Sequence, residues 1–305
     1  MSEWSDGRRN RMWLGQTLKD RFVLGRKLGK GTGGQLFEAF DLSYRNSVAV
    51  KFLSPRTFES ASYFAEFVQD MEEEAARLEK FRDMRGIPNL LDQGRDSDGT
   101  YFIVMQKVDG TTLKSYAENG NSPMELDTAV CIVAQLCEIL GDVHDRGYVH
   151  RDLKPENAMI DSAGQVHLID LGHMLEVGTE QYQPAGTNRY AAPEQVHELP
   201  VATSADVFPL GCMLAEMITL ALPYPENYLR FEHRGTPPPK PMLSSLAPHL
   251  IPLVSRMVSW DPERRPQNGW ATFRALQQFL PAKGSPRDYK LHGADPTARY
   301  RAEFE

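Results

Sequence analysis

One eight-residue stretch carries three side chains whose chemistry suits phosphoryl transfer. The stretch HRDLKPEN runs from His150 to Asn157. Asp152 could accept a proton from an attacking hydroxyl, Lys154 could neutralise charge on a transferred phosphoryl group, and Asn157 offers an amide oxygen to a divalent ion. Mg²⁺ is usually held by one or two carboxylates plus phosphate, so this interpretation requires a second carboxylate elsewhere. Without it, the stretch could equally be a polar turn.

The second carboxylate is predicted to be that of Asp170, in the run VHLIDLG. Its separation from Asp152 is 170 − 152 = 18 residues, and from Asn157 it is 170 − 157 = 13 residues. These gaps suit a short hairpin that returns Asp170 beside Asn157, with DSAG at 161–164 as its turn. Taken singly, Asp170 could be a turn residue and Asn157 a cap, but their joint order favours a site.

A glycine-rich run upstream is a candidate phosphate-binding segment. Gly29, Gly31 and Gly34 follow a GxGxxG spacing between two strand-like runs, which disfavours a dinucleotide-binding strand-to-helix turn. A purely structural hairpin is the alternative. Lys51 ends the run VAVK, where it could be a surface lysine or an ammonium that pairs with phosphates. One of the glutamates at 72–74 would then hold it.

The elements that must position these residues change character along the chain. Strand-like runs and one long helix come first, and mainly helical runs follow Gly110. We therefore expect a β-rich unit and an α-rich unit joined near residues 106–110. Clefts between such units commonly hold ligands. The expected strands are 22–31, 34–41, 47–53 and 101–108, and the expected helices are 58–81, 126–147, 204–224 and 249–260.

Composition narrows the class of protein. The net charge of −7 argues against a nucleic-acid partner. Three cysteines without zinc-ligand spacing predict reduced thiols and a cytoplasmic location. The chain shows neither a signal-peptide pattern nor a membrane segment. We expect residues 1–21 to be a flexible leader and residues 282–305 to be a loosely held polar tail.

Together these motifs resemble the eukaryotic-type serine/threonine protein kinases over roughly residues 22–281. The sequence pattern is more similar to the bacterial branch of this family. The resemblance implies an α+β, bilobal protein-kinase fold. Its N-lobe (22–106) would be an antiparallel sheet with helix C, its C-lobe (107–281) mainly helical, and its ATP cleft between them. It also implies transfer of the γ-phosphoryl group of ATP to Ser or Thr hydroxyls of protein substrates in a signalling pathway, with Mg²⁺, or Mn²⁺ as a substitute.

The resemblance assigns roles residue by residue. Asp152 is the catalytic base, Lys154 contacts the γ-phosphate, and Lys51 pairs with Glu74, which the family pattern favours because Leu78 follows four residues later. Asn157 and Asp170 are the metal ligands, although the motif reads DLG rather than DFG. The implied nucleotide contacts are Leu28, Gly29, Gly31, Gly34, Leu36, Ala49, Lys51, the gatekeeper Met105, the hinge Gln106 to Val108, Met159 and Asp170.

Further family features concern support and regulation. Glu194 in AAPE would pair with Arg265, Asp206 would brace the catalytic loop, and His150 would pack rather than act as a base. The implied regulatory residues are Arg151, which would bind a loop phosphate, Thr179 as an autophosphorylation site, and Thr187, which would support substrate binding. Trans-autophosphorylation would use a transient dimer. A catalytically silent scaffold, a small-molecule kinase and a non-enzymatic binding module stay open as rivals.

Overall fold

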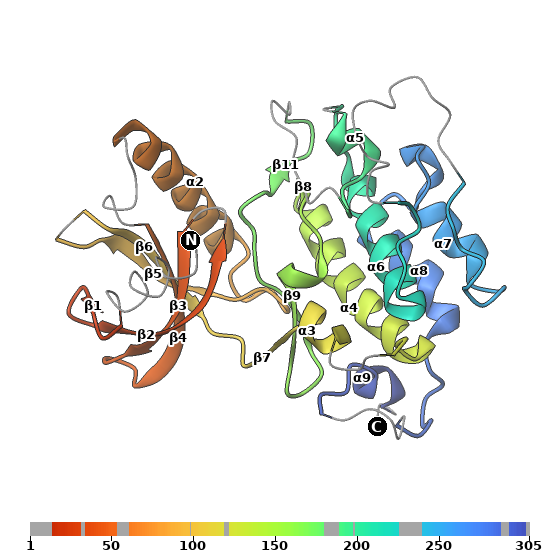
Figure 1. Ribbon diagram of the computed structural model, residues 1–305, viewed down its shortest axis with the longest axis horizontal. Coiled ribbons are helices and arrows are strands. Elements are labelled where there is room, and N and C mark those ends of the chain that lie inside the picture. Colours follow the sequence, from red (N-terminus) through yellow and green to blue (C-terminus); the bar gives the residue numbers. More distant parts are fainter. Residues whose placement is uncertain are drawn as a thin grey trace, which may run out of the picture. The chain divides into compact units, whose positions relative to one another are not determined.

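The computed structural model divides the chain into two compact units, and the division falls between Val108 and Asp109. The sequence places the boundary close by, after Gln106. Figure 1 shows the helices and strands of each unit. The structure describes residues 14–31, 34–53, 61–97, 99–118, 122–179, 189–197, 199–225, 240–287 and 293–302.

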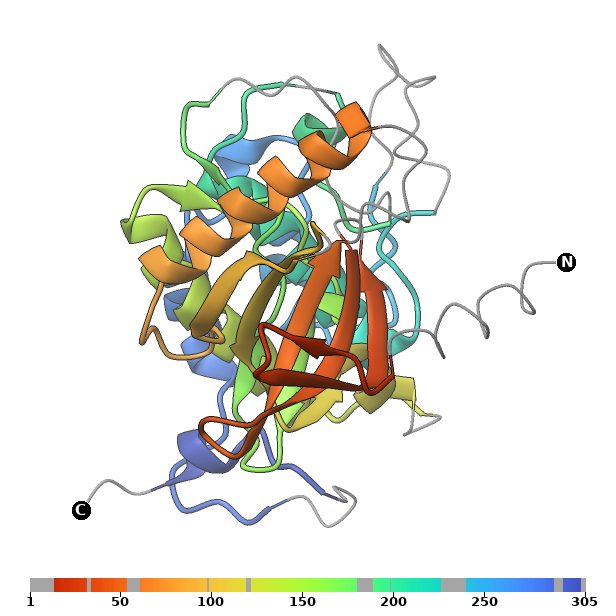
Figure 2. The ribbon, with the colours of Figure 1, turned by 90° about the vertical axis from the view of Figure 1, so that its left-hand side faces the viewer.

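The first unit is built on one antiparallel sheet of six strands, in the order β1-β2-β3-β4-β6-β5 (Figure 2). One helix, α2 (Ala61–Lys80), contacts β4, β5 and β6. The sequence predicts four of these strands and the helix, while β1 and β5 are additional. The strands are β1 (Thr17–Leu18), β2 (Phe22–Gly31), β3 (Gly34–Asp41), β4 (Asn46–Leu53), β5 (Leu90–Arg95) and β6 (Tyr101–Gln106).

The two faces of this sheet have different surroundings. Successive side chains in a strand point to opposite faces, so Ala49 and Lys51 share one face of β4. Ala49 pairs with Met105 of β6, and Lys51 pairs with Leu36 of β3, which places these residues on the same face. The opposite face holds the core cluster of Leu18, Phe22, Leu24, Phe37, Ala39, Val48, Val50, Phe52, Phe102 and Val104.

The predicted flexible leader is wrong for the part of it that forms β1. Thr17 pairs with Val23 and Leu18 with Phe22, and Leu18 is fully buried in the core cluster. Lys19 and Asp20 adopt φ values of 50° and 51°. Two successive residues with positive φ are characteristic of the tight turn that joins twisted antiparallel strands. The short hairpin holds an apolar residue on each side of its turn, and this buries the segment.

The second unit is mainly helical (Figure 1). Its longest helix, α4, packs against α6 and α8. A three-stranded sheet of order β10-β9-β7 and a pair formed by β8 and β11 complete it. The helices are α3 (Leu113–Glu118), α4 (Leu126–Asp145), α5 (Pro193–Val196), α6 (Val207–Thr219), α7 (Ile251–Met257), α8 (Gly269–Leu276) and α9 (Ala298–Arg301). The strands are β7 (Gly110–Thr112), β8 (Tyr148–Val149), β9 (Ala158–Asp161), β10 (Val166–Leu168) and β11 (Leu175–Glu176).

Two glycines explain why α4 and α8 approach so closely. A Cβ atom on Gly141 would lie 2.5 Å from the Trp270 ring, and one on Gly269 would lie 2.3 Å from the Gly141 nitrogen. Neither position has room for a side chain, because the backbones and the indole already fill the space. The contact fixes the end of α4 from which the chain enters β8 and the HRDLKPEN stretch.

The prediction of a loosely held tail is wrong for residues 293–301. Thr297 is buried, and Arg299 Nη1 lies 2.7 Å from Glu138 Oε2 on α4. The segment is polar, as the sequence shows, but its polar groups bond to the helical unit. Among the described residues no helix combines the length and the apolar character that a membrane crossing needs.

One ion pair of the first unit leads to a prediction about pH. Arg21 donates to both carboxylate oxygens of Asp41, at 2.9 and 2.7 Å, and only 2% of the Asp41 side chain is exposed. These hydrogen bonds hold the pKa of Asp41 below its ordinary value of 3.8. The stabilisation is therefore complete above about pH 4 and is lost as the pH falls through the lower pKa of the folded state.

We expect Asp41→Asn to lower the free energy of unfolding at pH 7 by roughly 2 kcal/mol. The difference from the wild type should shrink as the pH falls below about 4, through the lowered pKa at which the native carboxylate becomes protonated. Urea titrations at these pH values measure it. The matched control is Asp20→Asn, which removes an exposed carboxylate from the turn after β1. A deficit that does not shrink as the pH falls below about 4, or one equal to that of the control, would contradict the prediction.

Candidate active site

The backbone of the HRDLKPEN stretch is held from inside the helical unit by Asp206. This carboxylate is fully buried at the start of α6 and accepts the backbone N–H groups of His150 at 2.7 Å and Arg151 at 2.9 Å. It also lies 2.9 Å from His144 Nε2. The prediction that Asp206 braces this loop is confirmed. Burial alone would raise the pKa of Asp206, but the hydrogen bond from His144 and the neighbouring donors lower it.

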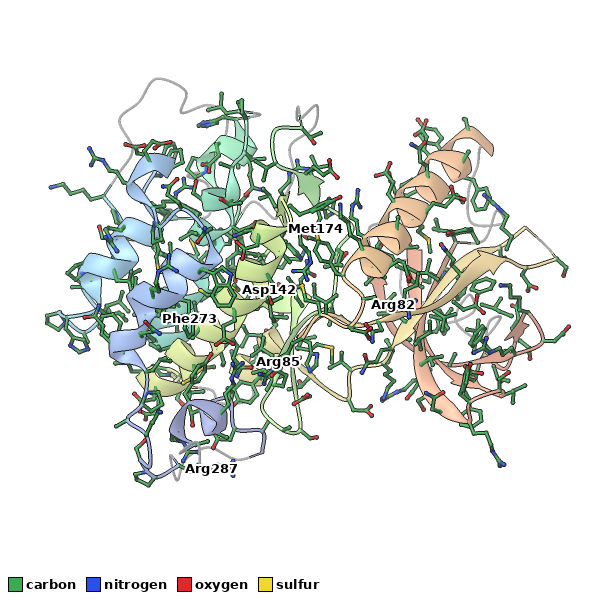
Figure 3. The ribbon with its side chains drawn as sticks, turned by 180° about the vertical axis from the view of Figure 1, so that it is seen from behind. Arg82, Arg85, Asp142, Met174, Phe273 and Arg287 are labelled. Carbon is green, nitrogen blue, oxygen red and sulfur yellow. The ribbon has the colours of Figure 1, made fainter. Side chains whose placement is uncertain are left out.

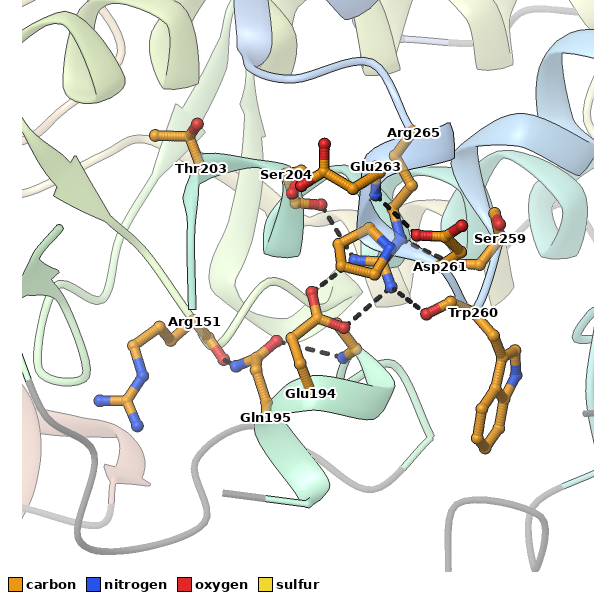
Figure 4. Close-up of polar contacts among 12 residues, drawn as sticks. Arg151, Glu194, Gln195, Thr203, Ser204, Ser259, Trp260, Asp261, Glu263 and Arg265 are labelled. Atoms are coloured by element: carbon orange, nitrogen blue, oxygen red, sulfur yellow. Dashed lines mark hydrogen bonds and ion pairs between the residues drawn. The ribbon is translucent and has the colours of Figure 1, made fainter. Parts of the chain in front are cut away.

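Arg151 is strained, and this strain is held at both ends of the residue. Its φ of 70° is uncommon for a residue with a side chain. Its N–H is bound by Asp206, and its carbonyl accepts from Gln195 Nε2 at 2.7 Å (Figure 4). Such strain persists only where the surrounding structure imposes it, and it is common at functional sites. The Arg151 guanidinium contacts the His173 carbonyl through Nη1 at 3.4 Å.

His150 is a packing residue, as the sequence suggests. Its side chain is fully buried, and burial lowers the pKa of its imidazole, although Asp206, Asp152 and Asp170 act in the opposite direction. Its Nδ1 accepts the N–H of Asp152 at 3.3 Å. A neutral, buried ring of this kind supports the loop and is closed to a substrate hydroxyl.

Two predicted catalytic residues, Asp152 and Lys154, and the predicted metal ligand Asn157 meet at the carboxylate of Asp152. Lys154 Nζ lies 2.6 Å from Asp152 Oδ2, and Asn157 Nδ2 donates to the same oxygen at 2.9 Å. Asn157 Nδ2 also donates to the Asp152 carbonyl at 2.9 Å. Asp152 is 5% exposed, so its carboxylate is oriented by an ammonium and an amide in a largely dry setting. That arrangement suits an oriented carboxylate base.

The predicted hairpin between Asn157 and Asp170 is confirmed. Strand β9 begins directly after Asn157, and β10 ends two residues before Asp170. The backbone N–H of Ile169, beside Asp170, donates to the Asn157 carbonyl at 2.9 Å. The turn is made by DSAG, where Asp161 Oδ1 accepts from the N–H groups of Ala163 and Gln165, both at 2.9 Å.

The donor set at the open end of this hairpin fits a hard divalent cation. Asn157 uses Nδ2 for Asp152, so the free end of its amide is the oxygen Oδ1. Asp170 is half-buried, and its Oδ1 accepts from Gly172 N at 3.0 Å. Within the described residues no group of three or more His, Cys, Asp and Glu side chains could hold a metal. An amide and a carboxylate are the partial set that Mg²⁺ takes when phosphates complete its shell.

In the first unit the structure brings together the two residues that the sequence pairs. Lys51 Nζ lies 2.5 Å from Glu74 Oε2, and their side chains are 9% and 6% exposed. Glu74 lies on the buried stripe of α2, between Met71 and Leu78. Buried ammonium and carboxylate groups are costly unless they are paired, so this pair fixes α2 against β4.

Most of the other predicted nucleotide contacts of the first unit lie along one hairpin and one sheet face, whereas Gln106 pairs with Val48 of the opposite face and Val108 follows the end of β6. Antiparallel β2 and β3 bring Gly31 opposite Gly34 and Gly29 opposite Leu36. Gly34 has φ +141°, and a Cβ there would lie 2.7 Å from the Phe52 carbonyl, so this position requires glycine. The remaining positions are exposed Leu28, buried Ala49 and Met105, exposed Gln106 and half-buried Val108. In the second unit, Met159 is half-buried on β9.

The predicted pair of Glu194 and Arg265 is confirmed and anchors the segment that follows residues 180–188. Arg265 donates to both Glu194 oxygens at 2.6 and 2.8 Å, and its own side chain is fully buried (Figure 4). Its remaining donors reach the carbonyls of Ser259 at 2.7 Å and Ser204 at 3.2 Å. A planar guanidinium can satisfy this many acceptors, whereas an ammonium cannot.

The regulatory residues are only partly described. Thr179 is exposed just after β11, and its N–H donates to the Glu176 carbonyl at 3.1 Å. The nearby Glu176 carboxylate accepts from the Tyr148 hydroxyl at 2.5 Å. Thr187 lies outside the described residues.

A pocket of about 880 Å³ in the helical unit was not anticipated from the sequence. It adjoins the catalytic loop through Pro155 and Glu156, and it is charged on several sides. Lys114 lies 3.0 Å from Glu156, and Tyr190 donates to Glu216 at 2.5 Å. Other lining residues are Thr111, Leu113, Tyr116, Ala117, Glu118, Ser122, Pro123, Met124, Glu125, Thr128, Arg189, Met217, Leu220, Gly293 and Ala294. The adjoining PE of HRDLKPEN is a signal in the sequence that could have pointed to it.

Two buried glutamines were also missed. Gln195 holds Arg151, and Gln135 holds the turn of the β9–β10 hairpin through Gly164 and Val166. Gln135 is fully buried on α4 and is a lone polar residue in the otherwise apolar run VCIVAQLC. A polar residue there signals a buried hydrogen-bonding role, but its partners could not be read from the run.

Comparisons with known proteins place this geometry in a family. The model of the protein kinase domain family matches residues 22–278. The chain is 31% identical to the serine/threonine-protein kinase PknD of Mycobacterium tuberculosis, over 80% of this chain and 37% of that protein. It is 30% identical to the serine/threonine-protein kinase PknB of Mycolicibacterium smegmatis, over 83% of this chain and 42% of that protein. For PknB of Mycobacterium leprae the identity is 31%, over 82% and 41%.

The chain therefore belongs to the protein kinase domain family, and the predicted fold class is confirmed. Its members use ATP together with a divalent metal ion. The chain spans about two fifths of the length of the curated relatives it matches.

The Glu194–Arg265 pair leads to a prediction about stability. Arg265→Lys keeps the charge but loses the fork that binds both oxygens and the backbone carbonyls. We expect the free energy of unfolding to fall by roughly 2–3 kcal/mol, as measured by urea denaturation at pH 7. Arg264→Lys is the control, because its side chain is 78% exposed and pairs with Asp261 at the surface. Equal effects of the two substitutions would show that the buried fork does not stabilise the unit.

Proposed function

We propose that this chain is a serine/threonine protein kinase that transfers the γ-phosphoryl group of ATP to Ser or Thr hydroxyls of protein substrates. The observation that carries the proposal is the convergence of Lys154 and Asn157 on one oxygen of the buried Asp152, at 2.6 and 2.9 Å. A carboxylate held in this way can orient an acceptor hydroxyl and take its proton. Lys154 is then placed to offset charge on the transferred group.

The division of roles follows from the contacts within each unit. Lys51, fixed by Glu74, offers an ammonium to the α- and β-phosphates, and Leu36, Ala49 and Met105 share its face of the sheet. Gly29, Gly31 and Gly34 allow backbone N–H groups to approach phosphate oxygens. Asn157 and Asp170 would hold Mg²⁺, with Mn²⁺ as a substitute. An ion held there would supply positive charge that offsets the negative charge of the phosphates.

The protein substrate is proposed to bind along the pocket beside the catalytic loop. Glu156 lines this pocket and lies four residues after Asp152, so the pocket borders the loop that carries the proposed base. Lys114 and Arg189 also line the pocket, where they form ion pairs with Glu156 and Glu216, respectively. The mixed charge favours an acceptor segment that carries both signs over a uniformly charged one.

We also propose regulation through the segment after Asp170. Arg151 lies close to this segment, and exposed Thr179 offers a hydroxyl that phosphorylation would convert into an anion. Transfer to Thr179 in trans would need a transient dimer. A cytoplasmic location, where thiols stay reduced, agrees with the free and buried state of Cys131, Cys137 and Cys212.

Transfer of radiolabel from ATP to casein or myelin basic protein tests the function. The wild type should label these proteins in the presence of Mg²⁺, and Asp152→Asn should lower the rate by about 10²–10⁴-fold because the oriented base is lost. Asp170→Asn should abolish the metal-dependent rate. The control Asp127→Asn makes the same charge change at an exposed position of α4 and should leave the rate unchanged. Wild-type turnover in Asp152→Asn would overturn the assignment.

Autophosphorylation gives a separate prediction. After incubation with Mg·ATP, mass spectrometry should find phosphate on Thr179 of the wild type and none in Asp152→Asn. If Arg151 binds that phosphate, Arg151→Lys should reduce the activation that follows incubation, since lysine lacks the bidentate fork. An active wild-type enzyme with an unmodified Thr179 would remove the site from the proposal.

A further inference from the structure

The side chain of Gln135 joins three segments that are far apart in sequence. It is fully buried on α4, and its Oε1 accepts the N–H of Val166 at 2.9 Å. Its Nε2 donates to the carbonyls of Gly164 and Pro296, both at 3.0 Å. Gly164 and Val166 belong to the β9–β10 hairpin, whereas Pro296 lies beyond residue 278, where the family match ends. Both N–H groups and the oxygen of the amide are therefore used.

The same hairpin turn is in direct backbone contact with the C-terminal segment. Gly164 has φ +82°, and a Cβ there would lie 2.1 Å from the Asp295 carbonyl oxygen and 2.9 Å from the Pro296 nitrogen. No side chain fits at this position while the segment keeps its place. We call residues 293–301 the C-terminal strap. It includes α9, which lies at the same end of the helical unit as the hairpin turn (Figure 1).

The strap is closed on itself by the carboxylate of Asp295. Its Oδ1 accepts from the N–H of Thr297 at 3.0 Å and from the Thr297 hydroxyl at 2.6 Å, and Oδ2 binds Arg301. Burial alone would raise the pKa of Asp295, but the hydrogen bonds from Thr297 and the charge of Arg301 lower it. Arg287, at the same end of the unit in Figure 3, donates to the Gly293 carbonyl at 2.6 Å.

Three further contacts tie the strap to the helices. The Tyr116 hydroxyl of α3 donates to the Ala294 carbonyl at 3.2 Å. On α4, Glu138 accepts from the Tyr300 hydroxyl at 3.3 Å and pairs with Arg299 at 2.7 Å. Buried partners and several independent anchors are the features of a segment that belongs to the folded unit.

The hairpin that the strap supports is small. Strand β9 has four residues and β10 has three, and their third strand, β7, adds three more. Hairpins of this size are at best marginally stable by themselves, so their shape depends on what packs against them. The ends of this hairpin lead to Asn157 and Asp170, and a displaced turn would shift one strand relative to the other. Small displacements of ligating or catalytic groups strongly reduce rates.

We propose that the C-terminal strap is a positioning element of the phosphotransfer site: through Gln135 and Gly164 it holds the β9–β10 hairpin in the register that sets Asn157 and Asp170. This inference rests on the proposed roles of those two residues. The strap itself contacts neither of them through any hydrogen bond described above, so it acts through the hairpin. Deleting it would also remove Gly293 and Ala294 from the wall of the pocket, and point substitutions in the full chain are therefore the better test.

The main variant is Gly164→Ala, with Gly15→Ala as its matched control. Both glycines have φ +82°, so both substitutions carry the same backbone strain, but a Cβ at Gly15 meets nothing within 4 Å. Only Gly164→Ala should displace the strap. A second variant, Thr297→Val, loosens the Asp295 closure without touching the hairpin. It keeps the shape of a buried side chain and loses the hydroxyl donor.

Hydrogen–deuterium exchange of the metal-free proteins is the first readout. We expect Gly164→Ala to speed exchange at least tenfold in peptides that cover 157–170 and 293–302, and Thr297→Val to do so to a smaller extent. Gly15→Ala should change neither peptide. The second readout is the Mg²⁺ concentration that gives half-maximal transfer at saturating ATP. It should rise several-fold in Gly164→Ala and Thr297→Val, while the KM for a peptide substrate stays within twofold.

Faster exchange in 293–302 alone, with 157–170 and the Mg²⁺ requirement unchanged, would overturn the proposal and leave the strap a packing element only. The proposal would also be overturned if Gly164→Ala behaved like Gly15→Ala in both measurements. The exchange measurement needs no turnover. A wild-type chain that transfers no phosphate would therefore refute the proposed function separately, without altering the exchange result.

Discussion

The helical unit is organised around one fully buried carboxylate, that of Asp206. A carboxylate without solvent is stable only when donors surround it. Here the donors are His144 Nε2 and two successive backbone N–H groups, those of His150 and Arg151. The His144 ring is oriented in turn, because its Nδ1 accepts from Gly269 N at 3.0 Å. Since the donors are backbone groups, the buried charge sets the path of the chain immediately before Asp152.

This constraint explains why strain is tolerated at Arg151. The left-handed φ of Arg151 turns the chain so that the side chains of Asp152 and Lys154 can meet. Releasing the strain would cost Asp206 one donor and Gln195 its acceptor. The strain in the loop is thus offset by hydrogen bonds to buried groups of the core. Within this stretch, His150 and Arg151 position the backbone, whereas the neighbouring Asp152 and Lys154 are the residues proposed to carry out the chemistry.

Buried ion pairs supply the other fixed points, and each joins segments distant in sequence. Lys51 and Glu74 lock α2 to the sheet, while Glu194 and Arg265 lock α5 to the segment before α8. Such pairs add little net stability over apolar substitutes, but a partner left alone is strongly destabilising. They therefore favour one arrangement of the backbone over its alternatives. Both pairs were predicted through the family resemblance, because the charged side chains stand at the expected positions of its motifs.

Three residues that escaped prediction, Gln135, Gln195 and Gly164, share a different property: their partners are backbone atoms. Gln135 binds one N–H and two carbonyls, Gln195 binds the Arg151 carbonyl, and Gly164 is required because the Asp295 carbonyl lies against it. Backbone groups are the same at every position, so no residue type at the far end reveals the contact. By contrast, Asp152, Asn157 and Asp170 were predictable, because phosphate and metal chemistry demands particular side chains at particular spacings.

Packed structure extends beyond both ends of the family match. The family match covers residues 22–278, whereas packed structure begins before it, with Leu18 in the sheet core, and continues beyond it, with Pro296 on Gln135. The first addition is held by the buried Leu18 side chain and its strand pairing, and the second by side chains of α3 and α4 that bond to the strap. A domain ends physically where buried donors and acceptors stop finding each other. By that criterion the strap belongs to the same unit as Asn157 and Asp170.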